Sequence, residues 1–437
     1  MVPESIQITL TPDQIHAKDT LLSGLKTNKM ALLTGYAGTG KTTLTMVMAQ
    51  EFSKIFGQIS IATPTHKAAA VCRQVQKDFG LSFETGTIHS LLGIGIKQTL
   101  DGRTKLLPPS KAISGLLIVD EASMIDSELY DHIINYAEKI LFVGDIAQLP
   151  PINSEVSPVF ERVQIRAHLN NIMRQAADSP IIQLATWLRD KIEANKSINI
   201  PELIAQCSQI DPEETKIGTD RVNHISAIVA SAKAEGMDAR MVGYTNAETS
   251  KCGMDIKKAI NNSASSLFGP GDPVYYATPK MVWADHKGKI EIENNTEAFV
   301  LNASEQAVCP KSGLLYQDLL LSNSDTWIRV PVQISEYRKM VKKLQEEYAV
   351  INLKSKFAAD PALVAELKKA NSEMSHFLPN NFSDLRINHA LTIHKSQGST
   401  FDVVVLNLRD IFKMREHLLR ALYVAITRPS KYLVFCY

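Results

Sequence analysis

The sequence predicts an α/β protein that contains two parallel sheets. Between residues 10 and 150, short apolar segments alternate with helical stretches, which is typical of a parallel sheet covered by helices. These segments include ALLT, QISIATPT, GLLIVDE and KILFVGD. A second α/β pattern, with apolar strands ARMVGYTN, FDVVVLNL and KYLVFCY, follows in the second half of the chain. A long insert separates the first of these strands from the other two, so the second sheet is split in sequence.

The composition is that of a globular protein, and the length leaves room for about two to four domains. The chain has 437 residues, of which 45% are hydrophobic and 21% are charged. Because the formal net charge is only +1, any nucleic-acid site must be a local groove. The start of the chain lacks the features of a signal peptide, and no apolar run is long enough to span a bilayer, so no membrane partner is expected. The scattered cysteines disfavour a zinc site or a disulfide framework and fit a reducing compartment; they are Cys72, Cys207, Cys252, Cys309 and Cys436.

A glycine-rich loop, GYAGTGKTT at 35–43, stands between an apolar strand and a helical segment. This strand–loop–helix context is typical of a P-loop, whose backbone N–H groups face the phosphates of a nucleotide. Lys41 is expected to reach the β and γ phosphates, and the Thr42 hydroxyl to bind Mg²⁺. The alternative, an ordinary glycine-rich turn, is disfavoured by the Lys-Thr pair and the preceding strand. The residues expected to contact the nucleotide are Gly35, Ala37, Gly38, Thr39, Gly40, Lys41, Thr42 and Thr43.

A second apolar strand ends in two carboxylates, in LLIVDE at 116–121. Asp120 is expected to hold Mg²⁺, and Glu121 to orient and deprotonate the attacking water. A base aimed at water indicates hydrolysis rather than phosphoryl transfer to a metabolite. The alternative is a strand that happens to end in a solvated acidic turn, which the upstream P-loop makes the weaker interpretation.

Polar residues follow the strands of the first sheet, in GTGKT, TPTHKAA, DEAS and GDIAQLPP. Since ligands gather beyond the carboxyl ends of parallel strands, these segments should line one crevice. Residues 92–114 interrupt this pattern with two arms around Asp101-Gly102, which predicts a small β-hairpin insertion.

The long insert reads as two parts. The first alternates apolar and polar residues and is rich in turns, which predicts a small β barrel. The second has apolar residues at helical spacing on either side of Asp360-Pro361, a plausible cap, and predicts a helical pair whose apolar stripes pack together. The stripes are Met340, Leu344, Tyr348 and Ile351, then Leu363, Leu367, Ala370, Met374 and Phe377.

Two arginines that follow the first α/β pattern are candidates for stabilising charge on the γ phosphate. Arg428, in LYVAITRPSK, is presented from the second sheet, and Arg174, in NIMRQ, is the other candidate. Arginines of this kind are worth about 10³–10⁵ in rate, and they would couple hydrolysis to closure between the domains. For a single arginine taken alone, a surface salt bridge is the simpler interpretation.

The motifs and their order along the chain resemble those of superfamily 1 helicases, in the RecD/Pif1-like branch that moves 5′ to 3′. They are most similar to those of the Dda helicases of tailed phages. The resemblance covers nearly the whole chain. It implies that Gln14, in LTPDQ, reads the adenine and that Gln148, in GDIAQLPP, senses the γ phosphate. It also matches Arg174 and Arg428 to the arginines of motifs IV and VI, and places Gln397 and Gly398 near the ATP site.

The resemblance further implies contacts with single-stranded DNA from three loops. Threonine hydroxyls and backbone amides suit the positioning of phosphates without reading bases. The histidines of these loops lie on separate segments without a supporting Cys or acid at ligand spacing, so a metal site is disfavoured. The residues implied are Pro64, Thr65, His66, Thr87, His89, Thr392, His394 and Lys395.

The resemblance also implies a P-loop NTPase with two RecA-like parallel-sheet domains, each carrying an insertion. The domains expected are 1A (1–91 and 113–165, ATP-binding), the pin 1B (92–112), 2A (166–249 and 386–437), and 2B (250–385, an SH3-like β barrel and a helical tower).

These observations predict an ATP- and Mg²⁺-dependent DNA helicase that moves 5′ to 3′ on single-stranded DNA and unwinds duplex in replication, recombination or repair. The direction rests on the resemblance. The expected partners are single-stranded DNA, its junctions with duplex, and single-stranded-DNA-binding or replisome proteins. We expect a monomer in the cytoplasm of a bacterium, or of the host of a phage.

Three alternatives remain open. An RNA helicase of the same superfamily fits because phosphate and stacking contacts tolerate a 2′-hydroxyl. A P-loop kinase or metabolite ATPase should lack the second split sheet with its arginines. A DNA-binding scaffold with a vestigial ATP site should not keep the catalytic set intact.

Overall fold

The computed structural model describes residues 9–98, 104–151, 154–171, 179–261, 268–277, 280–284, 288–292, 296–354, 365, 369, 372–374 and 377–437. The chain divides into two compact units. The larger unit holds most residues up to 260 together with 390–437, and the smaller unit holds residues 261–389. Among the described residues, no helix is both long enough and apolar enough to cross a membrane.

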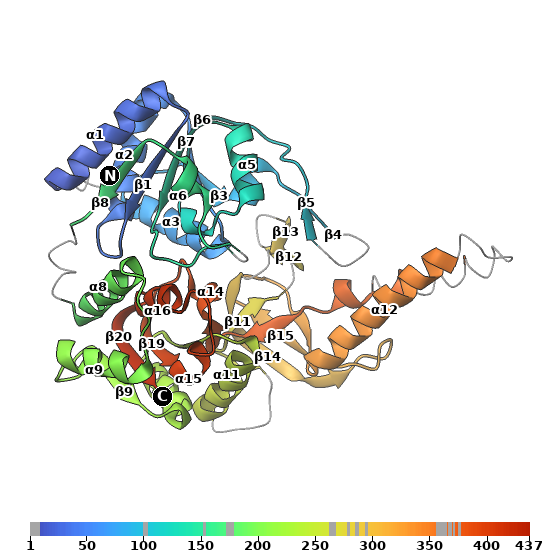
Figure 1. Cartoon of the computed structure of the whole chain (residues 1–437). Helices are drawn as coiled ribbons and strands as arrows, with labels where there is room; N and C mark the ends of the chain where they lie inside the picture. The colour runs from blue at the N-terminus through green and yellow to red at the C-terminus, as the bar shows by residue number, and fades with distance from the viewer. Residues whose placement is uncertain are drawn as a thin grey trace. The chain divides into compact units, whose positions relative to one another are not determined.

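The larger unit contains a six-stranded parallel sheet in the order β3-β2-β6-β7-β1-β8 (Figure 1). Its central strands are nearly continuous apolar runs, as expected for strands covered on both faces. The strands are β1 (Met30–Gly35), β2 (Ile59–Thr63), β3 (Glu84–Thr87), β6 (Ile113–Val119), β7 (Ala137–Gly144) and β8 (Arg166–Leu169).

Helices cover both faces of this first sheet. Alternate strand residues point to opposite faces, so neighbours such as Leu32 and Leu33 belong to different apolar clusters. The cluster with Leu33 packs against α1 (Pro12–Thr27), α2 (Lys41–Phe56) and α3 (His66–Asp78). The cluster with Leu32 packs against α4 (Ile88–Leu92), α5 (Ser127–Tyr136) and α6 (Pro158–Arg162).

A five-stranded parallel sheet in the order β18-β10-β19-β20-β9 completes the larger unit. Its strands are β9 (Ile217–Asp220), β10 (Ala239–Gly243), β18 (Ala390–Thr392), β19 (Phe401–Asn407) and β20 (Pro429–Cys436). One face packs against α8 (Pro180–Glu193), α9 (Ile200–Ile210), α14 (Ile393–Ser396), α15 (Leu408–Ile411) and α16 (Leu418–Ile426). The other face packs against α10 (Ile225–Ala234) and α11 (Asn246–Asn261).

The apolar core beneath α8 and α16 also takes in residues from the first sheet's side. Ala147 and Leu149, in the loop after β7, are buried in it, and Tyr36 and Ala37 of the P-loop pack against it. The two parallel sheets are therefore joined by a shared core within the larger unit.

The predicted fold class, an α/β protein with two parallel sheets, is confirmed. The two arms of the expected hairpin form β4 (Ile96–Gln98) and β5 (Thr104–Leu106), which pair antiparallel. Its turn, residues 99–103, lies outside the described residues.

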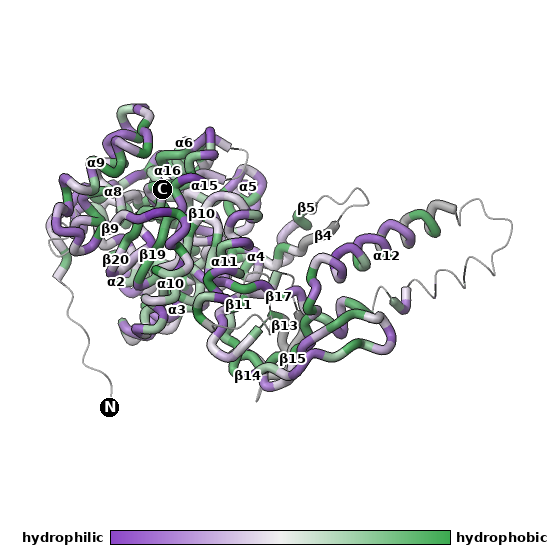
Figure 2. The backbone as a smooth tube through the Cα atoms, turned by 90° about the horizontal axis from the view of Figure 1, so that it is seen from below, coloured by the Kyte–Doolittle hydropathy of each residue, from purple (hydrophilic) through white to green (hydrophobic). Residues whose placement is uncertain are grey.

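The smaller unit contains a five-stranded antiparallel sheet in the order β16-β15-β14-β11-β17 and a two-stranded ribbon of β12 and β13. Purple and green alternate along its helix α12 (Ile334–Lys354), in keeping with one apolar face (Figure 2). Met340 and Leu344 of α12 pack in one cluster with Met374 and Phe377, as the expected helical pair requires; Leu363, Leu367 and Ala370 lie outside the described residues. The strands are β11 (Pro273–Tyr276), β12 (Lys280–Ala284), β13 (Gly288–Ile292), β14 (Glu297–Val308), β15 (Leu315–Leu321), β16 (Ile328–Pro331) and β17 (Leu385–Ile387).

The expected domain boundaries at 165/166, 249/250 and 385/386 do not coincide with the ends of the observed helices and strands. Residues 166–169 form β8, which pairs with β1, so they belong to the first sheet. Helix α11 continues through 250 to Asn261, and residues 385–387 form β17, which pairs with β11. The three differences have the same physical cause. The domain to which a short strand or a helix end belongs depends on the element that it packs against, and the local sequence does not show that element.

Candidate functional site

The P-loop connects β1 to α2 and leaves the start of that helix open. Gly38 and Gly40 have φ angles of +80° and +77°, a left-handed conformation that suits glycine. No side chain caps α2 at Gly40. The first N–H groups of the helix therefore lack a side-chain acceptor, which is the arrangement that binds phosphate at a helix N-terminus.

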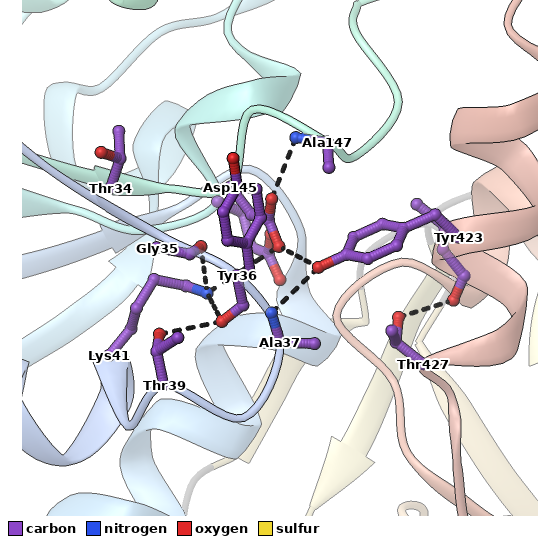
Figure 3. A network of polar contacts seen from close by, with 12 residues as sticks. Thr34, Gly35, Tyr36, Ala37, Thr39, Lys41, Asp145, Ala147, Tyr423 and Thr427 are labelled. Atoms are coloured by element: carbon purple, nitrogen blue, oxygen red, sulfur yellow. Dashed lines mark hydrogen bonds and ion pairs between the residues drawn. The ribbon is translucent and has the colours of Figure 1, made fainter. Parts of the chain in front are cut away.

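Lys41 is folded back onto its own loop. Its Nζ donates to the carbonyl oxygens of Gly35 at 2.7 Å and Tyr36 at 2.9 Å, and lies 3.9 Å from Asp145 Oδ2 (Figure 3). Carbonyls are neutral acceptors, so a phosphate oxygen could replace them with a stronger, charge-assisted bond.

Asp120 and Glu121 follow β6 side by side. The Glu121 N–H donates to Asp120 Oδ1 at 2.8 Å, and the Cys72 thiol lies 3.8 Å from Asp120 Oδ2. Glu121 has a φ of +54°, a conformation that is strained for a residue with a side chain and that clusters at functional sites. The backbone here holds Glu121 in a fixed direction at some conformational cost.

Electrostatics set these two carboxyls apart from ordinary ones. Burial raises the pKa of Asp120. Burial and the charge of Asp120 raise the pKa of Glu121 to about 7, although Arg428 and Lys41 act in the opposite direction. Two crowded carboxylates would be relieved by a divalent cation, so Asp120, with Thr42 at the start of α2, fits the expected Mg²⁺.

Gln14 lies beside the P-loop on α1. Its side chain closes a capping box by accepting from the Thr11 N–H at 3.1 Å. Its Nε2 donates to the Thr39 carbonyl at 3.3 Å. In this structure the amide group of Gln14 links helix α1 to the P-loop. The expected contact of Gln14 with adenine stays a prediction.

The loop after β7 carries Asp145 and Gln148. Asp145 is 1% exposed and accepts from the Ala147 N–H at 2.9 Å. Gln148 is buried, and its Oε1 makes no hydrogen bond. A buried acceptor without a donor costs free energy, which is a common sign of a group that acts on a ligand.

Helix α16, from the second sheet, contacts this loop and the P-loop directly. Tyr423 donates its hydroxyl to Asp145 Oδ2 at 2.8 Å and accepts from the Ala37 N–H at 2.9 Å (Figure 3). Arg420, one turn earlier, donates to the carbonyls of Ile146 and Gln148. Asp145, Arg420 and Tyr423 are not among the site residues predicted from the sequence. The feature of the sequence that could have identified them is a polar side chain within a mostly apolar segment.

Arg428 follows the end of α16 and is 8% exposed. Its guanidinium donates to the carbonyls of Val424 at 2.9 Å and Ser399 at 3.2 Å, and to the Thr427 hydroxyl at 2.9 Å. Burial lowers the pKa of Arg428, and the negative charge of Glu121 raises it, so the two side chains share one electrostatic environment. Arg174 lies outside the described residues.

Gly398 lies against helix α3. Gly398 has a φ of +69°, and a Cβ at this position would come within 3.1 Å of the Ala68 Cβ. Only glycine combines that backbone conformation with so close an approach. Gln397 is buried and its Nε2 makes no hydrogen bond, so it resembles Gln148 in carrying an unused polar atom.

A second tyrosine connects the P-loop to α8. The Tyr36 hydroxyl donates to Glu193 Oε1 at 2.5 Å, and the Arg189 guanidinium lies 4.5 Å from the centre of the Tyr36 ring. Burial and the neighbouring Glu193 raise the pKa of Tyr36, so its hydroxyl remains protonated and able to donate.

The DNA residues expected on the first sheet's side lie at the starts of helices α3 and α4. The Thr65 hydroxyl accepts from the Ala68 N–H, and the Thr87 hydroxyl accepts from the Ser90 N–H, each at 3.2 Å. These hydroxyls therefore act as helix caps. Burial lowers the pKa of His66, and the charge of Arg73 lowers it further, which favours the neutral imidazole. Pro64 and His89 are partly exposed beside them.

Three other expected DNA residues line one hollow of about 1100 Å³. Thr392, His394 and Lys395 line it together with residues that were not predicted from the sequence. Burial and the nearby His417 lower the pKa of His394. The additional lining residues are Leu149, Pro150, Pro151, Ser154, Glu155, Tyr244, Thr245, Asn246, Lys413, Met414, Arg415, Glu416 and His417.

Asp410 holds one wall of this hollow. It is 1% exposed, and it accepts from the N–H groups of Tyr244 at 2.7 Å and Thr245 at 2.8 Å and from the Thr245 hydroxyl at 2.9 Å. Burial alone would raise the pKa of Asp410, but the hydrogen bonds from Thr245 and Tyr244 outweigh it and the pKa lies below its ordinary value.

We expect Asp410→Asn to lower the free energy of unfolding by about 1–3 kcal/mol at pH 7, because it weakens bonds to a buried charge. A carboxyl whose folded pKa is depressed stabilises the fold above its unfolded pKa of about 3.9, and this stabilisation is lost as the pH falls below that value. The gap between the original chain and the variant should therefore narrow in acid, as measured by urea unfolding at several pH values. Asp131→Asn, at an exposed ion pair with Arg162, is the control and should change little. A gap that does not depend on pH would contradict the prediction.

Two family models match the chain. The first, described as an AAA domain, matches residues 9–200, and the second, described as a UvrD-like helicase C-terminal domain, matches residues 388–436. These ranges contain the P-loop in the first case and Arg428 in the second.

Relatives of known sequence match at low identity. An uncharacterised protein, MJ1519, of Methanocaldococcus jannaschii is 24% identical over 92% of this chain and 36% of its own length. The ATP-dependent RecD2 DNA helicase of Deinococcus radiodurans is 31% identical over 43% of this chain and 25% of its own length. The chain thus spans about a third of one relative and a quarter of the other.

Solved structures share the fold. A Bacteroides Pif1 bound to single-stranded DNA matches with a TM-score of 0.52 and 17% identity, over 98% of this chain and 92% of that chain. None of these likenesses bears on the expected closeness to Dda helicases, which stays a prediction. The two matched models, which contain the P-loop and Arg428, and the fold shared with Pif1 agree with the resemblance of the chain to RecD/Pif1-like helicases of superfamily 1.

Proposed function

We propose that this protein hydrolyses ATP to move 5′ to 3′ along single-stranded DNA and to separate duplex DNA. The names of the RecD2 and Pif1 relatives support the helicase activity and the DNA substrate. The direction rests on the family resemblance. Single-stranded-DNA-binding or replisome proteins are the partners that such an activity would need in replication, recombination or repair, and the proposed compartment is the cytoplasm.

One observation carries the proposal: α16, from the second sheet, meets the nucleotide loop of the first. Tyr423 bonds the P-loop and Asp145, and the charges of Arg428 and Glu121 act on each other. An ATP site completed from two sheets makes hydrolysis depend on their approach, which is the basis for coupling chemistry to movement.

The proposed roles follow from the chemistry of each group. Lys41 and the N–H groups at the start of α2 bind phosphate, and Thr42 and Asp120 hold Mg²⁺, which neutralises phosphate charge when it is bound. Glu121 accepts the proton of the attacking water, and Arg428 stabilises charge that develops on the phosphate. Gln148 and Gln397 each have a buried polar atom available for the same site.

The hollow lined by Thr392, His394 and Lys395 is the proposed path of the strand on the second sheet's side. Its lining holds the cations Lys395, Lys413 and Arg415 beside the carboxylates Glu155 and Glu416. Cations and small polar groups favour phosphate contacts that tolerate any sequence. With the boundaries corrected above, we propose the two sheets as domains 1A and 2A, the β4–β5 hairpin as the pin, and residues 261–389 as domain 2B.

We expect Glu121→Gln to bind ATP but to hydrolyse it about 10²–10⁴-fold more slowly, because an amide cannot accept the proton of water. Single-turnover hydrolysis and nucleotide-binding titrations would measure the two effects separately. Glu128→Gln, on α5, is the matched control and should retain activity. Near-normal turnover by Glu121→Gln would reject Glu121 as the base.

The function is tested on duplexes that carry a single-stranded tail at either the 5′ or the 3′ end, with ATP and Mg²⁺. Separation of only the 5′-tailed DNA duplex is the expected result. Separation of only the 3′-tailed duplex would overturn the direction, and separation of only RNA duplexes would overturn the substrate. ATP hydrolysis that no polynucleotide stimulates would overturn the proposal altogether.

A further inference from the structure

Tyr423 lies where three functional segments meet. Its hydroxyl accepts from the P-loop N–H of Ala37 and donates to Asp145, which in turn lies 3.9 Å from Lys41 Nζ. Tyr423 is 1% exposed and Asp145 is equally buried. A single hydroxyl thus uses both its donor and its acceptor capacity to join the second sheet's helix to the first sheet's nucleotide loop (Figure 3).

The hydroxyl is held in the protonated form that this geometry requires. Burial raises the pKa of Tyr423 well above its ordinary value, and the negative charge of Asp145 raises it further. The bond to Asp145 is therefore an O–H donor to a carboxylate, which is among the stronger hydrogen bonds in proteins.

The same helix carries the arginine that is proposed to act on the phosphate. Arg428 donates through Nε to the carbonyl of Val424, the residue next to Tyr423, and its own N–H donates to the carbonyl of Ala425. Its guanidinium is thereby tied to the last turn of α16. Because Tyr423 holds α16 against the P-loop, the position of α16 relative to the P-loop determines the position of the Arg428 guanidinium.

Arg420 supports the same seating from the preceding turn. It donates to the carbonyls of Ile146 and Gln148, so residues 420 and 423 grip the loop after β7 from one face of α16. A helix held at two points cannot shift along or rotate about its axis without breaking a bond at one of them.

We infer that Tyr423 is a positioning residue for Arg428, and that its hydroxyl aligns the arginine by docking α16 on the P-loop and Asp145. This inference rests on the proposed ATP hydrolysis. Tyr423 itself touches no phosphate in this role, so its loss should act on the rate of the chemical step and should spare ATP binding. A tyrosine that only fills the core would instead lower stability and leave the kinetics of folded protein unchanged.

Tyr423→Phe removes the hydroxyl and keeps the ring. We expect kcat for DNA-stimulated ATP hydrolysis to fall about tenfold while KM for ATP stays within about twofold, because a misplaced group loses transition-state stabilisation that the ground state does not use. Tyr130→Phe is the control, since the buried Tyr130 hydroxyl lies 3.7 Å from the sulfur of Met30, within the first sheet's core. It should leave both constants unchanged.

The deciding measurement is a double-mutant cycle with Arg428→Ala. If Tyr423 acts through Arg428, adding Tyr423→Phe to Arg428→Ala should lower kcat by less than about twofold further. The same tenfold loss in both backgrounds would overturn the inference. If Tyr423→Phe melts below the assay temperature, Arg420→Met provides the same cycle through the second contact of α16. Failure of the unaltered chain to hydrolyse ATP would instead refute the proposed function, so the two failures are distinguishable.

Discussion

Replacing Arg428 by alanine should lower kcat for ATP hydrolysis by about 10³–10⁵-fold while leaving ATP affinity nearly unchanged. The guanidinium is held by carbonyls of α16 and the loop before β19, and its charge reaches Glu121. It therefore approaches the site from the second sheet, whereas Lys41 and the helix start that bind phosphate belong to the first. An interaction that strengthens as charge develops lowers the barrier without contributing equally to binding.

Steady-state hydrolysis at saturating DNA and a fluorescent-nucleotide titration would separate the two effects. Arg409→Ala, at an exposed position on α15, is the matched control and should behave as the unaltered chain does. Arg428→Lys keeps the charge but loses the planar fork, so an intermediate rate is expected. Equal losses of ATP affinity and kcat would show that Arg428 binds the ground state as strongly as the transition state. Arg428 would then not act by stabilising the charge that develops during hydrolysis.

Replacing Lys41 by alanine should abolish ATP hydrolysis to below about 10⁻³ of the original rate while DNA binding persists. Its ammonium donates to the P-loop carbonyl of Gly35 at 2.7 Å. The residues that line the hollow proposed for DNA are all different ones. Loss of Lys41 should therefore separate the two activities.

Hydrolysis assays and fluorescence anisotropy with a labelled single-stranded oligonucleotide would test this separation. Lys54→Ala is the control, because Lys54 lies exposed in the last turn of the same helix. Hydrolysis by Lys41→Ala within about tenfold of the original rate would mean that the phosphate site is misassigned. Loss of DNA binding in parallel would mean that the variant is misfolded or that the two sites are one.

The features that could be predicted from the sequence are those encoded within a short window. The P-loop, the strand that ends in Asp120 and Glu121, and the two-sheet α/β class each follow from local pattern. The boundaries could not be read in this way. Strand β8 is only four residues long, and its pairing with β1 joins segments more than a hundred residues apart.

The same distinction applies to the site. Gln148 and Arg428 could be named because their motifs are local, whereas Tyr423 and Asp145 form a bond across 278 residues of sequence. Lys413 and Arg415 were missed because only the folding of the second sheet brings them beside Thr392 and His394. The sequence around a basic residue does not show whether its side chain lies in a groove or on open surface.

The core shared by the two sheets has a thermodynamic consequence for the proposed cycle. Ala147 and Leu149 are buried with the apolar residues of α8 and α16, so parting the sheets would bring hydrocarbon into contact with water. Hydration of apolar surface carries a large positive heat-capacity change. The enthalpy of opening should therefore rise with temperature, and where opening limits turnover, an Arrhenius plot of ATP hydrolysis should curve.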